Sequence, residues 1–439
     1  IPYPNLASTG MPDTCGFYET NTNLWKCLEL RDRLEAAGAF VMMSHTKGGP
    51  WPYEKVNGEY PDYTWEAYQQ LPDFEKYNRP LLEIADEAEA NNMDYFISVH
   101  SNAATDGNTV NYLAYFYRGN NAGEHVVPGA IEMCKASWYQ AFECRSMDGL
   151  EPTNYDTRDP ETSKHILADI DFYHSSYDAT LPSSGKTYTG YLGVLHHGVP
   201  GFLVEGYFHT YQPARHRALN PDYCKQEGIR YYRGIVDYFK ADTEATGYIL
   251  GTVKDEHEPL VHEMYKYAPN TNDQYKPLNG AVVTLSTEAG EVLATYTVDQ
   301  NYNGLFYFPN LEPGTYKLDA VADGYKPLHR QYQTVVVEAN ATSYPFLYLE
   351  DTAYVDLSNL YVDYPDPAQP AYAAVPEQFN MKQNELKDHT AKIKGTIKRT
   401  IQHADSVFYL THEEDGTAHI YVLNNTTGAL VTISTVGIV

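Results

Sequence analysis

The sequence predicts an α/β domain with a mixed, mostly parallel sheet flanked by helices, followed by an all-β sandwich and a short β-rich C-terminal segment. Up to about residue 245, helix-like and strand-like runs alternate, as they do in α/β domains. Over 246–350 the runs become short and are separated by Gly, Pro and Asn, which is typical of a sandwich. A Pro-rich, acidic stretch at 351–380 predicts a linker, and strand-like runs return over 381–439. A chain of 439 residues is also too long for one ordinary core, so two or three domains are expected.

The elements of the first domain, 1–245, follow from periodicity and turn residues. Leucines recur near a period of 3.6 over 21–37 and Gly38 comes next, so a helix is expected there. Pro80 favours the start of a second helix over 80–91. The remaining expected elements are helices over 128–144 and 221–240, strands over 39–44, 95–100, 111–117, 188–195 and 201–206, and irregular stretches over 47–72 and 145–186.

The later parts of the chain are predicted from short runs of β-favouring residues. The sandwich strands are expected at 247–253, 280–286, 292–298, 304–308, 314–320 and 333–338. The C-terminal runs lie at 393–401, 406–410, 419–423 and 430–435. With Asp415-Gly416 as a turn, these four runs predict antiparallel strands that could form a single propeller-like blade.

Charge and composition exclude several classes of partner. A formal net charge of −27 disfavours nucleic acid and anionic membranes, because both are bound through clustered Lys and Arg. No run approaches 18 apolar residues, so no membrane span is expected. The five cysteines form no C-x-x-C pair, which argues against a thiolate zinc knuckle.

Three ionisable residues stand where a metal or catalytic centre is often built. His100 ends an apolar strand-like run, and Glu205 interrupts another, where a carboxylate is costly to bury unless it is paired, metal-bound or catalytic. Glu19 lies at the start of the first predicted helix. Each also has a structural interpretation. His100 could be a core histidine, Glu205 an ion-pair partner and Glu19 a helix-capping carboxylate.

Taken together, stretches of the first domain resemble the zinc-dependent N-acetylmuramoyl-L-alanine amidases. The stretches that carry the resemblance are Glu19 with Asn23-Leu24 and 30–39, then Arg79 with 96–103, and then 193–195 with Pro200 and 203–208. The Ser-x-His-x-Asn-Ala and Leu-Val-Glu-Gly-x-Phe elements are fairly specific together and weak alone. The resemblance covers roughly residues 15–240.

The resemblance implies a Zn²⁺ cofactor, with Glu19 and His100 as zinc ligands and Glu205 as the catalytic base. His45 stands where the family usually has Arg, so it is not expected to be a ligand. The family's first zinc histidine, in a Gly-His-Gly-Gly turn, has no counterpart in this sequence, and its strand is expected upstream of Ile1. The alternatives are a degenerate, metal-poor site or substitution by His196 or His197.

The function implied is cleavage of the amide between N-acetylmuramic acid and the L-alanine of the peptidoglycan stem peptide, in the periplasm or outside the cell. Two alternatives stay open: a non-catalytic cell-surface binding protein with a degenerate amidase cleft, and a zinc peptidase of another class. The absence of H-E-x-x-H weakens the latter. Residues 280–316 resemble the carboxypeptidase regulatory-like, transthyretin-type sandwich, which implies a spacer or a platform facing glycan or cell wall.

Overall fold

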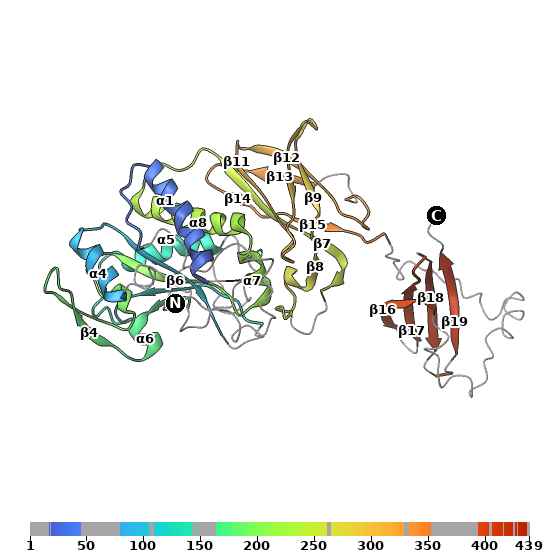
Figure 1. Ribbon diagram of the computed structural model, residues 1–439, viewed down its shortest axis with the longest axis horizontal. Coiled ribbons are helices and arrows are strands. Elements are labelled where there is room, and N and C mark those ends of the chain that lie inside the picture. Colours follow the sequence, from blue (N-terminus) through green and yellow to red (C-terminus); the bar gives the residue numbers. More distant parts are fainter. Residues whose placement is uncertain are drawn as a thin grey trace, which may run out of the picture. The chain divides into compact units, whose positions relative to one another are not determined.

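The computed structural model describes residues 17, 19–44, 80–104, 109–142, 147, 164–260, 265–328, 333–352 and 394–436, the last range with gaps at 404–405, 416, 425 and 428. The chain forms two compact units, residues 1–351 and 352–439 (Figure 1). The predicted insertion at 47–72 and the residues His45, Arg79 and Gly416 lie outside the described residues. Within the described part of the chain, no helix has the length and apolar character needed to cross a membrane.

The first unit begins with a four-stranded sheet of order β1-β6-β2-β3. Its strands are β1 (Phe96–Asn102), β2 (Ala114–Tyr117), β3 (Ile166–Ala168) and β6 (Gly201–Phe208). β1 pairs with β6 and β2 with β3 in parallel, whereas β2 and β6 are antiparallel. This confirms the predicted mixed, mostly parallel sheet.

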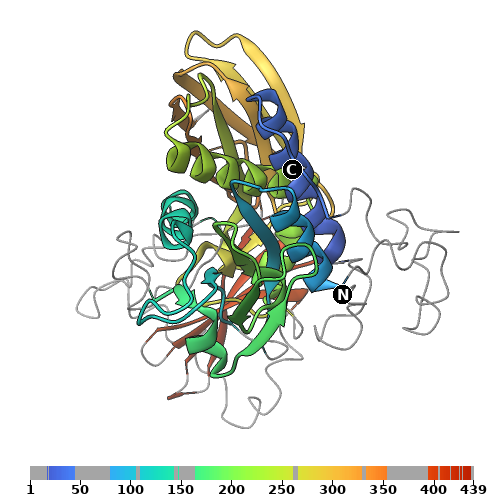
Figure 2. The ribbon, with the colours of Figure 1, turned by 90° about the vertical axis from the view of Figure 1, so that its left-hand side faces the viewer.

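Helices cover the sheet on both faces. They are α1 (Glu19–Ala36), α4 (Leu81–Ala90), α5 (Ala130–Phe142), α6 (Asp169–Tyr173), α7 (Gln212–Ala218) and α8 (Pro221–Phe239). α1 lies along α8, which also packs on α5 (Figure 2). Phe202 and Val204 of β6 point into the core that includes residues of these helices. Leu203 points to the other face, where it meets Phe116 and Leu195.

The sequence explains where these helices begin and end. The buried residues of α1 are at positions 19, 22, 23, 24, 26 and 30, and 19, 22, 23, 26 and 30 have the spacing of one helical face. Before α8, the side chain of Asn220 accepts the N–H groups of Asp222 and Tyr223 at 2.9 and 3.2 Å. Pro221 follows at the first helical position, so the start of α8 is fixed by a cap and a proline.

Two further sheets form the sandwich within the same unit. Its elements are β7 (Gly247–Pro259), η3 (Asn272–Gln274), β8 (Tyr275–Pro277), β9 (Val282–Thr287), β10 (Val292–Thr297), β11 (Leu305–Leu311), β12 (Gly314–Val321), β13 (Gln333–Val337), β14 (Thr342–Ser343) and β15 (Phe346–Leu349). One sheet has the order β10-β9-β12-β13, and the other is built around β7. Ile249, Val283 and Phe306 lie in the shared core, as expected for the predicted sandwich.

The sandwich and the α/β part share a buried interface. Tyr211 and Tyr223 pack in one cluster with Tyr248 and Tyr307 of the sandwich. Within it, the Tyr211 hydroxyl donates to Asp273 at 2.8 Å. The two parts are therefore packed together in one unit.

In the described part of the second unit, residues 394–436 form an antiparallel sheet. Its strands β16 (Thr396–His403), β17 (Ser406–His412), β18 (Ala418–Asn424) and β19 (Leu430–Val436) pair in sequence order. The four runs expected from the sequence coincide with these strands.

Two expected strands differ in the structure. Residues 39–44 form no strand. The run 188–195 is divided between β5 (Thr187–Gly190), which pairs with β4 (Tyr177–Thr180), and the short 3₁₀ helix η2 (Gly193–Leu195). The Asp169 carboxylate accepts the N–H groups of Tyr191 and Leu192 at 2.8 and 3.0 Å, which draws the chain out of the extended form there.

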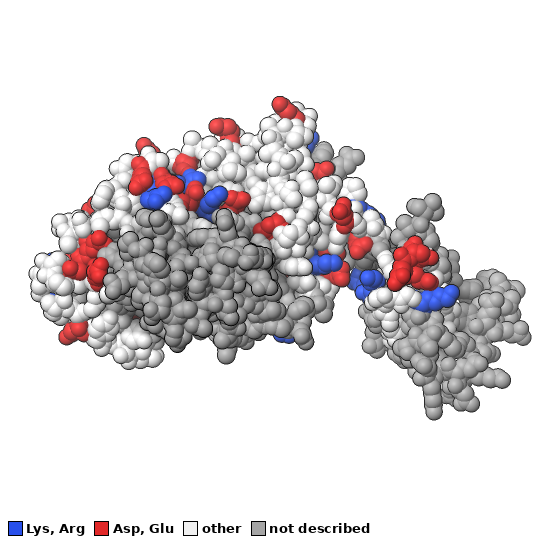
Figure 3. Space-filling view, in the orientation of Figure 1, with Lys and Arg blue, Asp and Glu red and all other residues white. Residues whose placement is uncertain are grey.

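On the described surface in Figure 3, acidic and basic side chains lie close to one another near α1. On α1, Arg31 contacts Asp32 at 2.6 Å and Arg33 contacts Glu29 at 2.7 Å. The exposed Arg31–Asp32 pair contributes little to stability, whereas the Arg33–Glu29 pair is partly buried.

Candidate metal and catalytic centre

The register of β1 against β6 places two of the predicted site residues side by side. His100 pairs with Glu205, and Ser98 pairs with Leu203 two residues earlier. Paired residues of neighbouring strands point to the same face, so His100 and Glu205 share the face that carries Leu203. Glu205 is the one partly exposed residue in the otherwise buried β6.

Glu19 reaches the same place from the first turn of α1. Its Oε1 accepts the backbone N–H of Ser101 at 3.0 Å and the side-chain amide of Asn23 at 3.3 Å. The same oxygen lies 3.5 Å from Nδ1 of His100. The ladder between β1 and β6 shifts register between His100 and Asn102, and this irregularity frees the Ser101 N–H for Glu19. The structure thus brings Glu19, His100 and Glu205 together.

Glu19 and His100 stabilise each other's charged forms. Burial alone would raise the pKa of Glu19, but the hydrogen bond and charge of His100 outweigh it and lower that pKa to about 2. Burial likewise opposes ionisation of His100, and the carboxylate of Glu19 overcomes it and raises the pKa of His100. The imidazole stays 42% exposed while the Glu19 side chain is 11% exposed, so His100 faces the open side of the pair.

The surroundings of Glu205 raise its pKa, whereas those of Glu19 lower the pKa of Glu19. Burial raises its pKa to about 7, and the nearby charge of Glu19 acts in the same direction, against the opposing charges of His100 and Lys26. A carboxylate with a pKa near 7 is well placed to accept a proton at neutral pH. Glu19 and Glu205 are thus two carboxylates whose surroundings push their pKa values apart, which is a common feature of catalytic sites.

Two neighbours of this centre were missed by sequence reasoning. Lys26 is fully buried, lies 2.9 Å from Glu227 of α8, and stands 4.1 Å from the ring centre of Tyr207. His209 is buried directly after β6, with Nδ1 3.1 Å from the Ser101 hydroxyl. Only the position of Lys26 seven residues after Glu19, on the same helical face, offered a signal.

The donor pair fits two positions of a zinc site. In a tetrahedral site with zinc–ligand distances near 2.0 Å, two ligand atoms lie about 3.3 Å apart, close to the 3.5 Å between Glu19 and His100. Among the described residues, no third His, Cys, Asp or Glu completes a group of three ligands around this pair. His196 and His197 precede β6 and contact Tyr177 and Phe96, at the far end of the strands from Glu205.

Comparisons with known proteins found one matching family model and several similar solved structures. A family model for the carboxypeptidase regulatory-like domain matches residues 271–344. No curated protein matches the chain in sequence. Among solved structures, an N-acetylmuramoyl-L-alanine amidase from Clostridium difficile 630 is similar at 17% identity and a TM-score of 0.33, covering 52% of this chain and 88% of that one.

Two further solved structures are amidases as well. The CwlD amidase of Clostridioides difficile, solved in complex with the GerS lipoprotein, has 19% identity, a TM-score of 0.32 and coverage of 52% and 88%. The amidase AmiC2 of Nostoc punctiforme has 15% identity, a TM-score of 0.31 and coverage of 51% and 86%. Identities of 15–19% with TM-scores of 0.31–0.33 assign neither a family nor an activity to this chain.

Proposed function

We propose that this chain is a zinc-dependent hydrolase that cleaves the amide between N-acetylmuramic acid and L-alanine in peptidoglycan. The observation that carries the proposal is the pairing of Glu205 with His100 across β1 and β6, beside Glu19. The sequence resemblance to the amidases supports the choice of substrate. The substrate lies outside the cytoplasm, so we place the protein in the periplasm or outside the cell.

Glu19 and His100 would hold the zinc ion. When bound there, zinc lowers the pKa of water and polarises the amide carbonyl. Glu19 is oriented for this by the Ser101 N–H and by Asn23. Nε2 of His100 lies 3.1 Å from the Ser98 hydroxyl, which fixes the ring so that Nδ1 faces Glu19.

Glu205 would act as the general base and then as the general acid. It takes a proton from the attacking water and passes it to the nitrogen of L-alanine, which leaves as a free amine. Its raised pKa keeps the two protonation states close in energy near neutral pH, so both transfers are feasible. The sandwich, packed on the α/β part, would serve as a spacer or as a platform facing glycan or cell wall.

A pair of defined substrates tests the proposal. The zinc-loaded protein is incubated with N-acetylmuramoyl-tripeptide and, separately, with the free tripeptide, and products are identified by mass spectrometry. We expect release of intact tripeptide with a free L-alanine amine from the first and no reaction with the second, and chelation by EDTA should stop the release. Cleavage within either peptide would indicate a peptidase instead. Binding of purified sacculi without cleavage would indicate a non-catalytic binding protein.

A further inference from the structure

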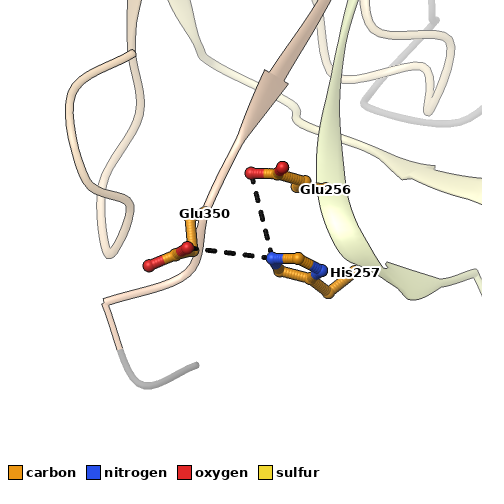
Figure 4. A group of neighbouring side chains, drawn as sticks. All are labelled: Glu256, His257 and Glu350. Atoms are coloured by element: carbon orange, nitrogen blue, oxygen red, sulfur yellow. Dashed lines mark ion pairs between the residues drawn. The ribbon is translucent and has the colours of Figure 1, made fainter. Parts of the chain in front are cut away.

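A second group of metal-binding side chains lies in the sandwich, at the end of β7. Nε2 of His257 is 3.8 Å from Oε2 of Glu256 and 3.8 Å from Oε2 of Glu350. Figure 4 shows the imidazole nitrogen directed between the two carboxylates. One ligand atom from each residue lies within 4.8 Å of the other two. The distances of 3.8 Å are too long for hydrogen bonds.

Strand pairing brings these residues together across more than ninety positions of sequence. β15 runs parallel to β7 with Leu349 opposite Asp255, so Glu350 emerges beside Glu256 and His257. Lys326 contacts Oε1 of Glu350, and the Lys326 backbone N–H donates to the Glu350 carbonyl at 2.8 Å. The other carboxylate oxygen, Oε2 of Glu350, lies 3.8 Å from Nε2 of His257.

The backbone that carries His257 is also held in place. The Asp255 carboxylate accepts the N–H groups of His257 and Glu258 at 2.8 and 2.6 Å. Its second oxygen accepts the Tyr325 hydroxyl at 2.9 Å. The imidazole is 26% exposed and the Glu350 side chain 14% exposed, so both are partly buried at the end of β7. Such support reduces the entropy lost when ligands converge on an ion.

We propose that Glu256, His257 and Glu350 bind one divalent transition-metal ion of the zinc type. Ligand atoms of a tetrahedral zinc site lie about 3.3 Å apart, so the two distances of 3.8 Å from His257 to the carboxylates need to shorten by about half an ångström. The Glu256 side chain, 40% exposed, has the freedom to do so. An imidazole nitrogen favours zinc, cobalt or nickel over calcium and magnesium, which take oxygen ligands.

The charge around the group favours a cation. Glu256 and Glu350 together carry two negative charges, and Lys326 contacts one oxygen of Glu350. Asp255, Glu258 and Asp351 form a second acidic group beside them, of which Glu258 is paired with Lys276 at 3.0 Å. The ion would join the end of β7 to the end of β15 and leave a coordination position for water. This site is independent of the proposed amidase centre.

The test uses the full chain carrying His100→Ala, which removes a ligand of the other proposed centre. We expect this chain to bind one Zn²⁺ by isothermal titration calorimetry and to give visible absorption with Co²⁺. Adding His257→Ala should weaken that binding at least tenfold and abolish the absorption, and Glu256→Gln, at a more exposed position, should weaken it as well. His419→Ala is the matched control, because Nε2 of His419 also lies near a carboxylate oxygen, 2.5 Å from Glu413, but His419 belongs to no group of three ligand residues in the described part of the chain.

Two results would overturn the proposal. One is Zn²⁺ affinity that His257→Ala and Glu256→Gln leave unchanged in a chain whose circular dichroism shows it to be folded. The other is tighter binding of Ca²⁺ than of Zn²⁺, which would assign the ion to carboxylate oxygens alone. Because the measurement is of metal binding in the His100→Ala chain, its outcome does not depend on whether the protein cleaves peptidoglycan.

Discussion

His100 of β1 and Glu205 of β6 are directly paired across two parallel strands, and their side chains lie on one face of the sheet. Glu19, from the first turn of α1, completes a group drawn from three distant parts of the sequence. Glu19 is stabilised as a carboxylate, whereas the pKa of Glu205 rises to about 7. This difference between the two acids underlies the roles proposed for them.

The pH dependence of hydrolysis should follow Glu205. A general base works only when ionised, so kcat/KM should rise with pH through a midpoint at or below 7. A cation bound at Glu19 and His100 would lower the pKa of Glu205. The midpoint of the pH–rate profile should therefore lie below 7 when the cation is bound. The measurement is kcat/KM for N-acetylmuramoyl-tripeptide between pH 5 and 8.5. A rate that falls as pH rises from 5 to 7 would rule out Glu205 as the base.

The buried pair Lys26–Glu227 should matter for stability and for the base. Lys26→Met leaves the Glu227 carboxylate buried without its cation, which should cost about 3–5 kcal/mol in urea unfolding. The neutral double variant Lys26→Met/Glu227→Met should recover most of that loss. Because the charge of Lys26 lowers the pKa of Glu205, the rising limb of the pH–rate profile should move to higher pH in the double variant.

Lys225→Met is the matched control for Lys26→Met. Lys225 pairs with Asp222 at 3.0 Å, but its side chain is 47% exposed, so its removal should change stability by less than about 0.5 kcal/mol. A pH–rate profile that does not move in the Lys26→Met/Glu227→Met variant would limit this pair to a structural role.

Asp273 should hold the sandwich on the α/β part. It accepts Arg217 at 2.6 Å and the Tyr211 hydroxyl at 2.8 Å, and Lys254 lies 3.6 Å away, all buried. Asp273→Asn removes the buried carboxylate that Arg217 and Lys254 share, so the free energy of unfolding should fall by about 3–5 kcal/mol. Asp237→Asn, in an exposed pair with Lys240, should have almost no effect. Equal losses in the two variants would contradict this role for Asp273.

His197 should make the fold sensitive to mild acid. Burial, aided by the charge of Arg118, lowers its pKa from 6.5 to about 4. Between these values the unfolded chain binds a proton that the folded chain does not, so stability falls as pH drops from 6.5 to 4. The maximum effect is roughly 3 kcal/mol. In urea unfolding at several pH values, His197→Gln should flatten this slope, and an unchanged slope would contradict the assignment.

The sequence predicts the main helices and the convergence at the sheet edge because both follow from local patterns. Apolar runs that end in a single ionisable residue identify His100 and Glu205, and a helix start identifies Glu19. Lys26 could not be identified in this way. A lysine on a helix is ordinarily exposed, and this one is buried only because Tyr207 and Glu227 pack against it.

Sequence patterns also did not predict the features that depend on pairing between distant segments. The strand expected over 188–195 is interrupted by Asp169, which lies some twenty positions earlier and takes two backbone N–H groups of the run. His257 has no motif around it, and it meets Glu350 only because β7 and β15 are neighbours. Such contacts are set by tertiary packing, which periodicity and turn residues do not report.

The most direct test of the proposed centre compares the wild-type chain with Glu205→Gln, both loaded with Zn²⁺ and with zinc content measured. Purified sacculi are digested with each protein, and freed stem peptides are quantified by mass spectrometry, with the exposed Glu132→Gln on α5 as control. We expect equal zinc content in all three proteins, release by the wild type and the control, and release lowered by about 10²- to 10⁴-fold in Glu205→Gln. Release at the wild-type rate by Glu205→Gln, or no release by the zinc-loaded wild type, would contradict the proposed catalytic centre.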